Sequence, residues 1–208
     1  MSVVADVYSA VPEMPLPVAP DMPLWRLSVE QYHALARQGF FSEDDRVELL
    51  EGLLVPKMTI LPPHRRSTHR VQTALRQNIP AGHYVASPSP VTLAASEPEP
   101  DVVVVRGSDD DYPDRHPGPD DVALLVEVSD TTLRHDQGFN KMIYAKARIV
   151  IYWIVNLIDR RVEVHTDPTG PGPMPDYRQR QDYAETDQVP LIIDGQEVAW
   201  IAVRELLP

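Results

Sequence analysis

Two acidic residues stand beside short apolar runs that are rich in β-branched side chains. Asp101 directly precedes Val102-Val103-Val104-Val105, and Glu127 lies within Leu124-Leu125-Val126-Glu127-Val128-Ser129. Such runs are typical of strands buried in a sheet, and an ionised carboxylate is costly to bury without a partner. We therefore expect two neighbouring strands to bring Asp101 and Glu127 together around a bound cation, as in a metal-dependent hydrolase.

Magnesium chemistry suits these residue types. Mg²⁺ in proteins is held by oxygen ligands, commonly one or two carboxylates with waters and substrate phosphates. A bound cation lowers the pKa of a water molecule and stabilises charge that develops on a phosphate. Glu48, within Arg46-Val47-Glu48-Leu49-Leu50-Glu51-Gly52, is a third acidic group in an expected strand and could complete the metal shell or accept a proton. The ammonium of Lys141 could orient the attacking water or offset the same charge.

Each of these residues also has an ordinary structural explanation. Asp101 could cap a turn after Pro100, and Glu127 could point outward from a half-exposed strand. The nearly continuous apolar run around Glu127 favours the metal site. Glu48 alternates with apolar neighbours, so an exposed strand position explains it almost as well as a functional role. Lys141 could be a solvated helix lysine.

The composition argues against some classes of function. The chain of 208 residues holds 19 Lys and Arg against 31 Asp and Glu, a net charge of −12. Non-specific coating of DNA depends on many contacts between basic side chains and phosphates, whereas a small basic cleft around a metal ion is compatible with this charge. The absence of cysteine excludes thiolate nucleophiles and cysteine-ligated metal sites. Because no apolar run spans a membrane and no signal-peptide pattern is present, we expect a cytoplasmic protein.

The pattern divides the chain into an N-terminal arm and one domain. Five prolines in residues 1–24 predict an extended or disordered arm, followed by a single α+β or α/β domain over residues 25–208. A capping box at Ser28 predicts a helix that runs to about Gln38. The other expected elements are a hairpin at 47–55 that turns at Glu51-Gly52, helices at 67–77 and 137–148, strands at 83–86, 91–94, 101–105, 122–129, 149–155, 161–165, 177–183 and 189–193, and a helical turn at 203–207. The acidic connection before residue 122 lacks the spacing of a calcium loop, so a solvated loop is expected there.

The helix expected at 137–148 bears on the candidate site. Phe139, Ile143 and Ala147 form an apolar stripe along it, with the spacing of one helix face. Lys141 lies away from the centre of that stripe, toward solvent or toward the sheet edge near Glu127.

Five short motifs follow one another along the chain. They are Arg46-Val47-Glu48-Leu49-Leu50-Glu51-Gly52, Glu99-Pro100-Asp101, Val126-Glu127-Val128-Ser129, Lys141 with Tyr144-Ala145, and Tyr152-Trp153-Ile154-Val155. This series resembles the Uma-type restriction endonuclease domain, a branch of the PD-(D/E)XK nuclease superfamily, over about residues 25–167. The resemblance implies a restriction-endonuclease-like core, with a mixed central sheet flanked by helices. It also implies a divalent-metal phosphodiesterase site, and the C-terminal β-meander would be an addition to the core.

The resemblance assigns roles to single residues. Asp101 and Glu127 match the acidic motif residues, which hold Mg²⁺ or Mn²⁺, and Glu48 matches the acidic residue before them. The superfamily's lysine usually lies two positions after the glutamate, where this chain has Ser129. In the Uma-type branch the lysine comes from the following helix, which Lys141 matches.

Basic residues before the second helix are candidates for binding the substrate. His64 stands where related sequences often carry a histidine. Arg65 and Arg66, which follow it, could contact phosphates or could balance nearby acidic groups.

Three functions remain open from the sequence. The first is a Mg²⁺- or Mn²⁺-dependent endonuclease that cuts nucleic acid, with DNA favoured over RNA. The second is a nuclease fold that no longer cuts and acts as a binding or regulatory module. The third is a metal-dependent hydrolase of a smaller anionic substrate. A homodimer through exposed hairpin strands is also conceivable. Under the first hypothesis we expect Asp101 and Glu127 on adjacent strands, with the ammonium of Lys141 in the same depression.

Overall fold

The computed structural model describes residues 23–42, 45–58 and 60–208. These residues form two compact units, the first from the described part of Met1–Lys57 with Ala94–Glu97, the second from Met58–Leu93 with Pro98–Pro208. The relative positions of the chain's parts are not determined, so the single domain expected over 25–208 stays a prediction. The arm expected over residues 1–24 lies outside the described residues except for its last two positions.

The first unit consists of a helix and a hairpin. Helix α2 spans Val29–Arg37, and Ser28 and Gln31 form the expected capping box at its start. Strands β1 (Val47–Leu50) and β2 (Leu53–Pro56) pair in antiparallel fashion around Glu51 and Gly52, both of which have positive φ. A Cβ at Gly52 would lie 2.6 Å from the Cβ of Arg26, so both space and backbone conformation call for glycine in this turn.

The second unit is built on a six-stranded mixed sheet with the order β3-β4-β5-β6-β7-β8. Strands β5 and β6 are parallel, and every other neighbouring pair is antiparallel. The expected α+β fold with a mixed sheet flanked by helices is therefore confirmed. The strands are β3 His83–Ala86, β4 Val102–Arg106, β5 Val122–Ser129, β6 Ile151–Asn156, β7 Arg161–Pro168 and β8 Tyr177–Ala184.

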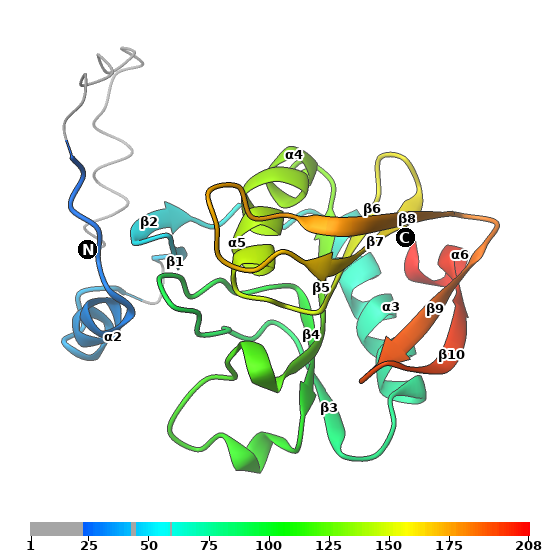
Figure 1. The fold of residues 1–208 in the computed structure, drawn as a ribbon, viewed down its shortest axis with the longest axis horizontal. Coiled ribbons are helices and arrows are strands. Elements are labelled where there is room, and N and C mark those ends of the chain that lie inside the picture. The colour runs from blue at the N-terminus through cyan, green and yellow to red at the C-terminus, as the bar shows by residue number, and fades with distance from the viewer. Residues whose placement is uncertain (1–22, 43–44, 59) are drawn as a thin grey trace. The chain divides into compact units, whose positions relative to one another are not determined.

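One face of this sheet carries the hydrophobic core. Alternate residues of β4 to β7 pack against helix α3 (Pro62–Asn78), the hairpin of β9 (Gln188–Ile193) and β10 (Gln196–Ala202), and the short helix α6 (Val203–Leu206). Trp153, at the centre of this layer, is almost fully buried. In Figure 1, α3 and α6 lie on one side of β5 and β6, and the segment from α4 to α5 lies on the other side.

The opposite face of the sheet, called the polar face below, is also buried and carries polar groups among apolar ones such as Leu125 and Ile154. It presents Glu127, Ser129, Asn156 and Glu163, all of which are buried. The segment that follows β5 covers this face and contains α4 (Leu133–His135), a π-helical turn (Asp136–Asn140) and α5 (Lys141–Lys146). Polar groups that are buried in this way need hydrogen-bond partners, and these partners define the site described below.

The helix expected at 137–148 differs from this segment. It begins earlier, contains the π-helical turn, and ends at Lys146. Ile143 is buried as expected, but Phe139 and Ala147 are only half-buried, and Asp136, Asn140 and Tyr144 are buried instead. The apolar stripe is therefore correct for Ile143 only, because polar residues of this segment bond to polar groups of the sheet.

Other expected elements agree in type and differ in extent. Helix α3 begins at Pro62, where a proline is well placed because the first helical N–H needs no partner. The strand expected at 91–94 is wrong, since the backbone N–H groups of Val91 and Thr92 bond to loop carbonyls. Strand β10 was not expected. Among the helices of the described residues, none combines the length and apolar character of a transmembrane helix.

Candidate functional site

Asp101 and Glu127 face each other across two hydrogen-bonded strands. The pairing of Val102 with Val126 puts Asp101, just before β4, opposite Glu127 in the antiparallel ladder. The backbone N–H of Asp101 donates to Oε2 of Glu127 at 3.3 Å, and the N–H of Val128 donates to Oδ2 of Asp101 at 2.8 Å. The two acids that the sequence singles out are thus brought together on the polar face of the sheet.

The carboxylate of Glu127 is held from the opposite side by the helix. The hydroxyl of Tyr144, a fully buried residue on α5, donates to Oε1 of Glu127 at 2.7 Å. A charge-assisted bond of this length fixes the orientation of the carboxylate. Glu127 is only 9% exposed, so its side chain is held before any ligand arrives.

His64 joins the pair from helix α3. Its Nε2 lies 3.2 Å from Oδ2 of Asp101. Burial alone would lower the pKa of His64, but its hydrogen bond to Asp101 and the charges of Asp101, Asp130 and Asp136 together raise that pKa. The imidazole therefore carries a positive charge more readily than an ordinary histidine.

Arg65 and Arg66 follow His64 in the first turns of α3. Both are exposed, and with Ile60, Leu61, Pro62 and His69 they line a surface pocket. Their guanidinium groups are therefore accessible to a solute. The long helix α3 also adds positive potential at this end through its backbone dipole.

Lys141 forms an ion pair in the structure. Its Nζ pairs with Oδ1 of Asp176, just before β8, at 2.9 Å. Burial alone would raise the pKa of Asp176, but the hydrogen bond and the charge of Lys141 lower it. The structure thus pairs the ammonium of Lys141 with Asp176, and its role at Asp101 and Glu127 stays a prediction.

Glu48 lies in β1, in the first unit, opposite Val55. Asp101 and Glu127 belong to the second unit, and the two units are not placed relative to each other. The role of Glu48 at the carboxylate pair therefore stays a prediction.

Asp136 is a third buried acid that sequence analysis missed. It accepts hydrogen bonds from the hydroxyls of Ser129 and Thr132, both at 2.7 Å, and from the side-chain amide of Asn140 at 2.9 Å. Burial raises its pKa, and the charge of Asp101 adds to that effect. The spacing of Asp136, Asn140 and Tyr144, four residues apart, was the available signal, because it marks one polar helix face.

The donor set fits a hard divalent cation. Asp101 and Glu127 supply carboxylate oxygens, and one or two carboxylates with waters and substrate phosphates make up a common Mg²⁺ shell. Among residues 23–42, 45–58 and 60–208, no group of three or more His, Asp or Glu side chains has the arrangement of a metal site. The fit to Mg²⁺ or Mn²⁺ therefore rests on the facing pair alone.

Comparisons with known proteins bear on this geometry. The sequence model of the Uma2 family, described as "Putative restriction endonuclease", matches residues 29–203. A crystal structure from Anabaena variabilis ATCC 29413, described as a putative nuclease belonging to DUF820, is similar with a TM-score of 0.63 and 11% sequence identity, over 86% of this chain and 97% of that chain. At that identity the likeness shows a shared fold alone. No curated protein matches the sequence.

Proposed function

Because this chain belongs to the Uma2 family, whose description is "Putative restriction endonuclease", we propose that it is a divalent-metal-dependent endonuclease that hydrolyses phosphodiester bonds in DNA. The observation that carries the proposal is the facing pair of Asp101 and Glu127, tied together by two backbone N–H groups. Metal-dependent sites for phosphodiester hydrolysis use such carboxylates to hold the ion against the scissile phosphate.

Each residue of the site has a distinct role in this proposal. Asp101 and Glu127 would hold Mg²⁺ or Mn²⁺, which when bound activates a water and offsets charge on the phosphoryl group. Tyr144 keeps the carboxylate of Glu127 in one orientation through its hydroxyl. His64, whose Nε2 contacts Oδ2 of Asp101, would help to hold that carboxylate in place.

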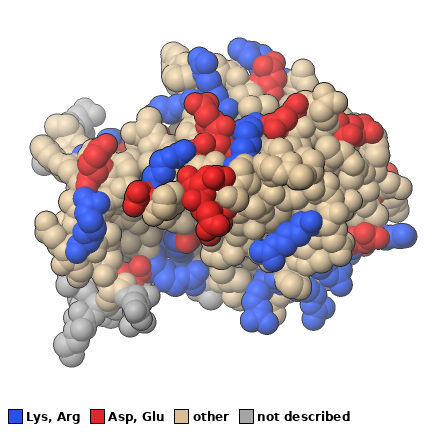
Figure 2. Space-filling model, turned by 90° about the horizontal axis from the view of Figure 1, so that it is seen from below, with Lys and Arg blue, Asp and Glu red and all other residues tan. Residues whose placement is uncertain are grey.

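Arg65 and Arg66 would bind phosphates that flank the scissile bond. They follow His64 on the same helix and are exposed. Binding through a few guanidinium groups is compatible with a net charge of −12, because it needs a local positive potential only. Figure 2 shows acidic and basic side chains interspersed on one face of the molecule, with acidic groups gathered near the middle of the view. We therefore expect local, salt-sensitive binding of DNA rather than coating of long stretches.

The test is cleavage by the purified full-length chain. Supercoiled plasmid, single-stranded DNA and RNA are incubated with Mg²⁺, with Mn²⁺ or with a chelator. We expect nicking or linearisation of plasmid with metal only. Asp101→Ala should reduce the rate by more than about a hundredfold, because loss of a direct ligand exceeds the typical cost of losing its supporting groups. Asp120→Ala removes an exposed acid from the loop before β5 and serves as the matched control.

Binding measurements separate the proposal from its competitors. Titration calorimetry with Mn²⁺ should give a binding signal in the wild-type chain that Asp101→Ala abolishes. Metal binding without cleavage of any nucleic acid would favour a hydrolase of smaller anionic substrates. Neither binding nor cleavage would mean a nuclease fold that serves as a binding module.

A further inference from the structure

The segment over the polar sheet face touches β5 at two successive points. Asp136 bonds to Ser129, and Tyr144 bonds to Glu127. Ser129 and Glu127 are two residues apart and so lie on the same face of the strand. Asn140 lies between Asp136 and Tyr144 on the helical segment, four residues from each, and is therefore opposite the stretch of β5 between those two side chains.

Only one of the two polar atoms of the Asn140 side chain has a hydrogen-bond partner among the described residues. Its Nδ2 donates to Oδ1 of Asp136 at 2.9 Å, and acceptance by a carboxylate fixes which end of the amide is nitrogen. Its Oδ1 is buried and has no hydrogen-bond partner among the described residues. The residue is only 8% exposed. An unpaired buried acceptor costs free energy. A water molecule or ligand that donates a hydrogen bond to Oδ1 of Asn140 would remove this cost.

The neighbouring Lys141 is engaged in an ion pair. One residue further along a helix, a side chain is rotated by about 100°. Its ammonium ends at Asp176, at 2.9 Å.

We infer that Asn140, and not Lys141, is the residue of this helical segment that acts at the carboxylate pair, and that its Oδ1 accepts a hydrogen bond from a water molecule held there. The inference rests on the proposed function, in which that water attacks the phosphodiester. An amide oxygen is too weakly basic to remove a proton from water. Asn140 therefore orients the water and leaves its deprotonation to other groups.

The first test compares five variants by steady-state cleavage of an oligonucleotide with Mn²⁺. Asn140→Leu keeps the size and loses the acceptor; we expect kcat to fall about 10- to 100-fold with KM nearly unchanged. Thr132→Val also removes one hydrogen bond to Asp136 but leaves the acceptor, so kcat should stay near that of the wild type. Lys141→Met and Asp176→Asn break the same ion pair and should both have small, similar effects. Asn140→Gln, which restores an amide, should recover part of the rate.

Three results of this comparison would overturn the inference. The inference is overturned if Asn140→Leu cleaves as the wild type does, or if Lys141→Met alone loses activity while Asp176→Asn does not. It is also overturned if Thr132→Val and Asn140→Leu lose the same activity, since the effect would then come from the support of Asp136. Thermal unfolding of each variant identifies a loss of activity that follows a loss of folding.

A second readout does not depend on cleavage. In Mn²⁺ calorimetry we expect Asn140→Leu to weaken binding by about tenfold, as for other groups that support a metal's shell, while Lys141→Met leaves the affinity unchanged. Equal affinity in the wild type and Asn140→Leu overturns the inference even if the wild type is an active nuclease. A wild-type chain that neither binds Mn²⁺ nor cleaves overturns the proposed function, and the inference with it.

Discussion

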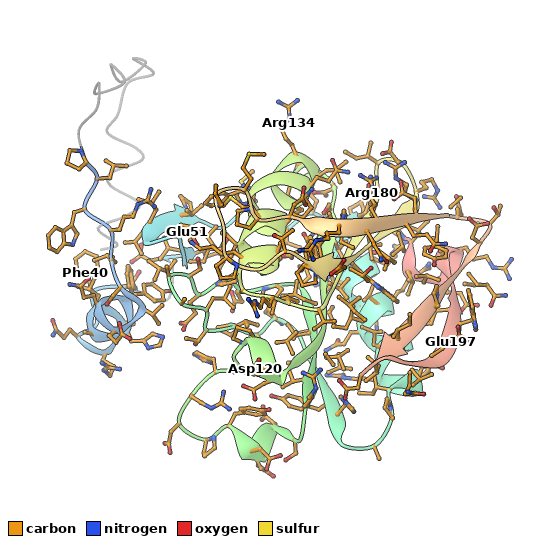
Figure 3. The ribbon with its side chains drawn as sticks, viewed as in Figure 1. Phe40, Glu51, Asp120, Arg134, Arg180 and Glu197 are labelled. Carbon is orange, nitrogen blue, oxygen red and sulfur yellow. The ribbon has the colours of Figure 1, made fainter. Side chains whose placement is uncertain are left out.

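Glu163 offers the sharpest test of the polar sheet face as a structural element. It lies on β7, is fully buried, and is surrounded by donors from three directions. Gln137 and Asn156 donate to it at 2.8 Å, and the guanidinium groups of Arg161 and Arg180 lie 3.2 Å from its carboxylate. Figure 3 labels Arg180 on β8 and Arg134, which by contrast points away from α4.

The contribution of ionised Glu163 to the free energy of unfolding can be worked out from the pKa of its carboxyl group. Burial alone would raise the pKa of Glu163, but its contacts with His165, Asn156, Gln137 and Arg180 lower it from 4.5 to about 2. At about 1.4 kcal/mol per pH unit, this lowering corresponds to about 3 kcal/mol of stability for the ionised form. That figure agrees with the loss of about 3–5 kcal/mol when one partner of a buried ion pair is removed.

The stabilisation by Glu163 should decrease as the pH falls. Because the folded-state pKa is below the unfolded one, the stabilisation is complete above about pH 4.5 and is lost as the pH falls toward about 2. Glu163→Gln imitates the protonated carboxyl. We therefore expect the variant to be about 3 kcal/mol less stable than the wild type at pH 7, and this difference to shrink steadily below pH 4.5.

Urea unfolding followed by tryptophan fluorescence measures this difference, because Trp153 is buried in the same unit. The matched control is Glu185→Gln, since Glu185 also pairs with an arginine, Arg160, but at the surface; little change is expected. The reasoning fails if Glu163→Gln costs no more than Glu185→Gln at pH 7. It also fails if the cost of Glu163→Gln is the same at pH 3 as at pH 7.

Three further outcomes are expected. Gly52→Ala should destabilise the first unit by more than about 1 kcal/mol, because a side chain there meets a positive φ and a close neighbour; Gly39→Ala, with positive φ but open space, should cost less in the same urea experiment. Tyr144→Phe should weaken Mn²⁺ binding by about tenfold with a modest loss of stability, since it frees Glu127 from its hydroxyl donor; unchanged affinity would contradict that role. Ser28→Ala should cost about 1 kcal/mol through loss of the capping box, measurable as reduced helical circular dichroism on heating.

Local chemistry made several elements predictable. The capping box of α2, the Glu51-Gly52 turn and the valine-rich strands β4 and β5 are each encoded by a few neighbouring residues. The meeting of Asp101 with Glu127 also follows from sequence, because buried carboxylates on adjacent strands have few other arrangements.

The remaining features depend on contacts between distant parts of the chain. The π-helical turn at Asp136–Asn140 is supported by bonds from Asp136 to Ser129 and Thr132, which helix periodicity cannot reveal. The direction of Lys141 depends on Asp176, which is far away in sequence. The conversion of residues 91–94 from strand to loop likewise reflects carbonyl partners in later loops.

Strand β5 is buried along its whole length, with valine and leucine toward the hydrophobic layer and Glu127 and Ser129 toward the polar one. Two sets of residues near the end of this strand therefore have different roles: Val126 and Val128 pack in the hydrophobic core, and Glu127 and Ser129 present polar groups on the opposite face. A change of reaction could arise by exchanging only the second set, without touching the packing that holds the strand in place. This division makes β5 a natural target for redesigning specificity.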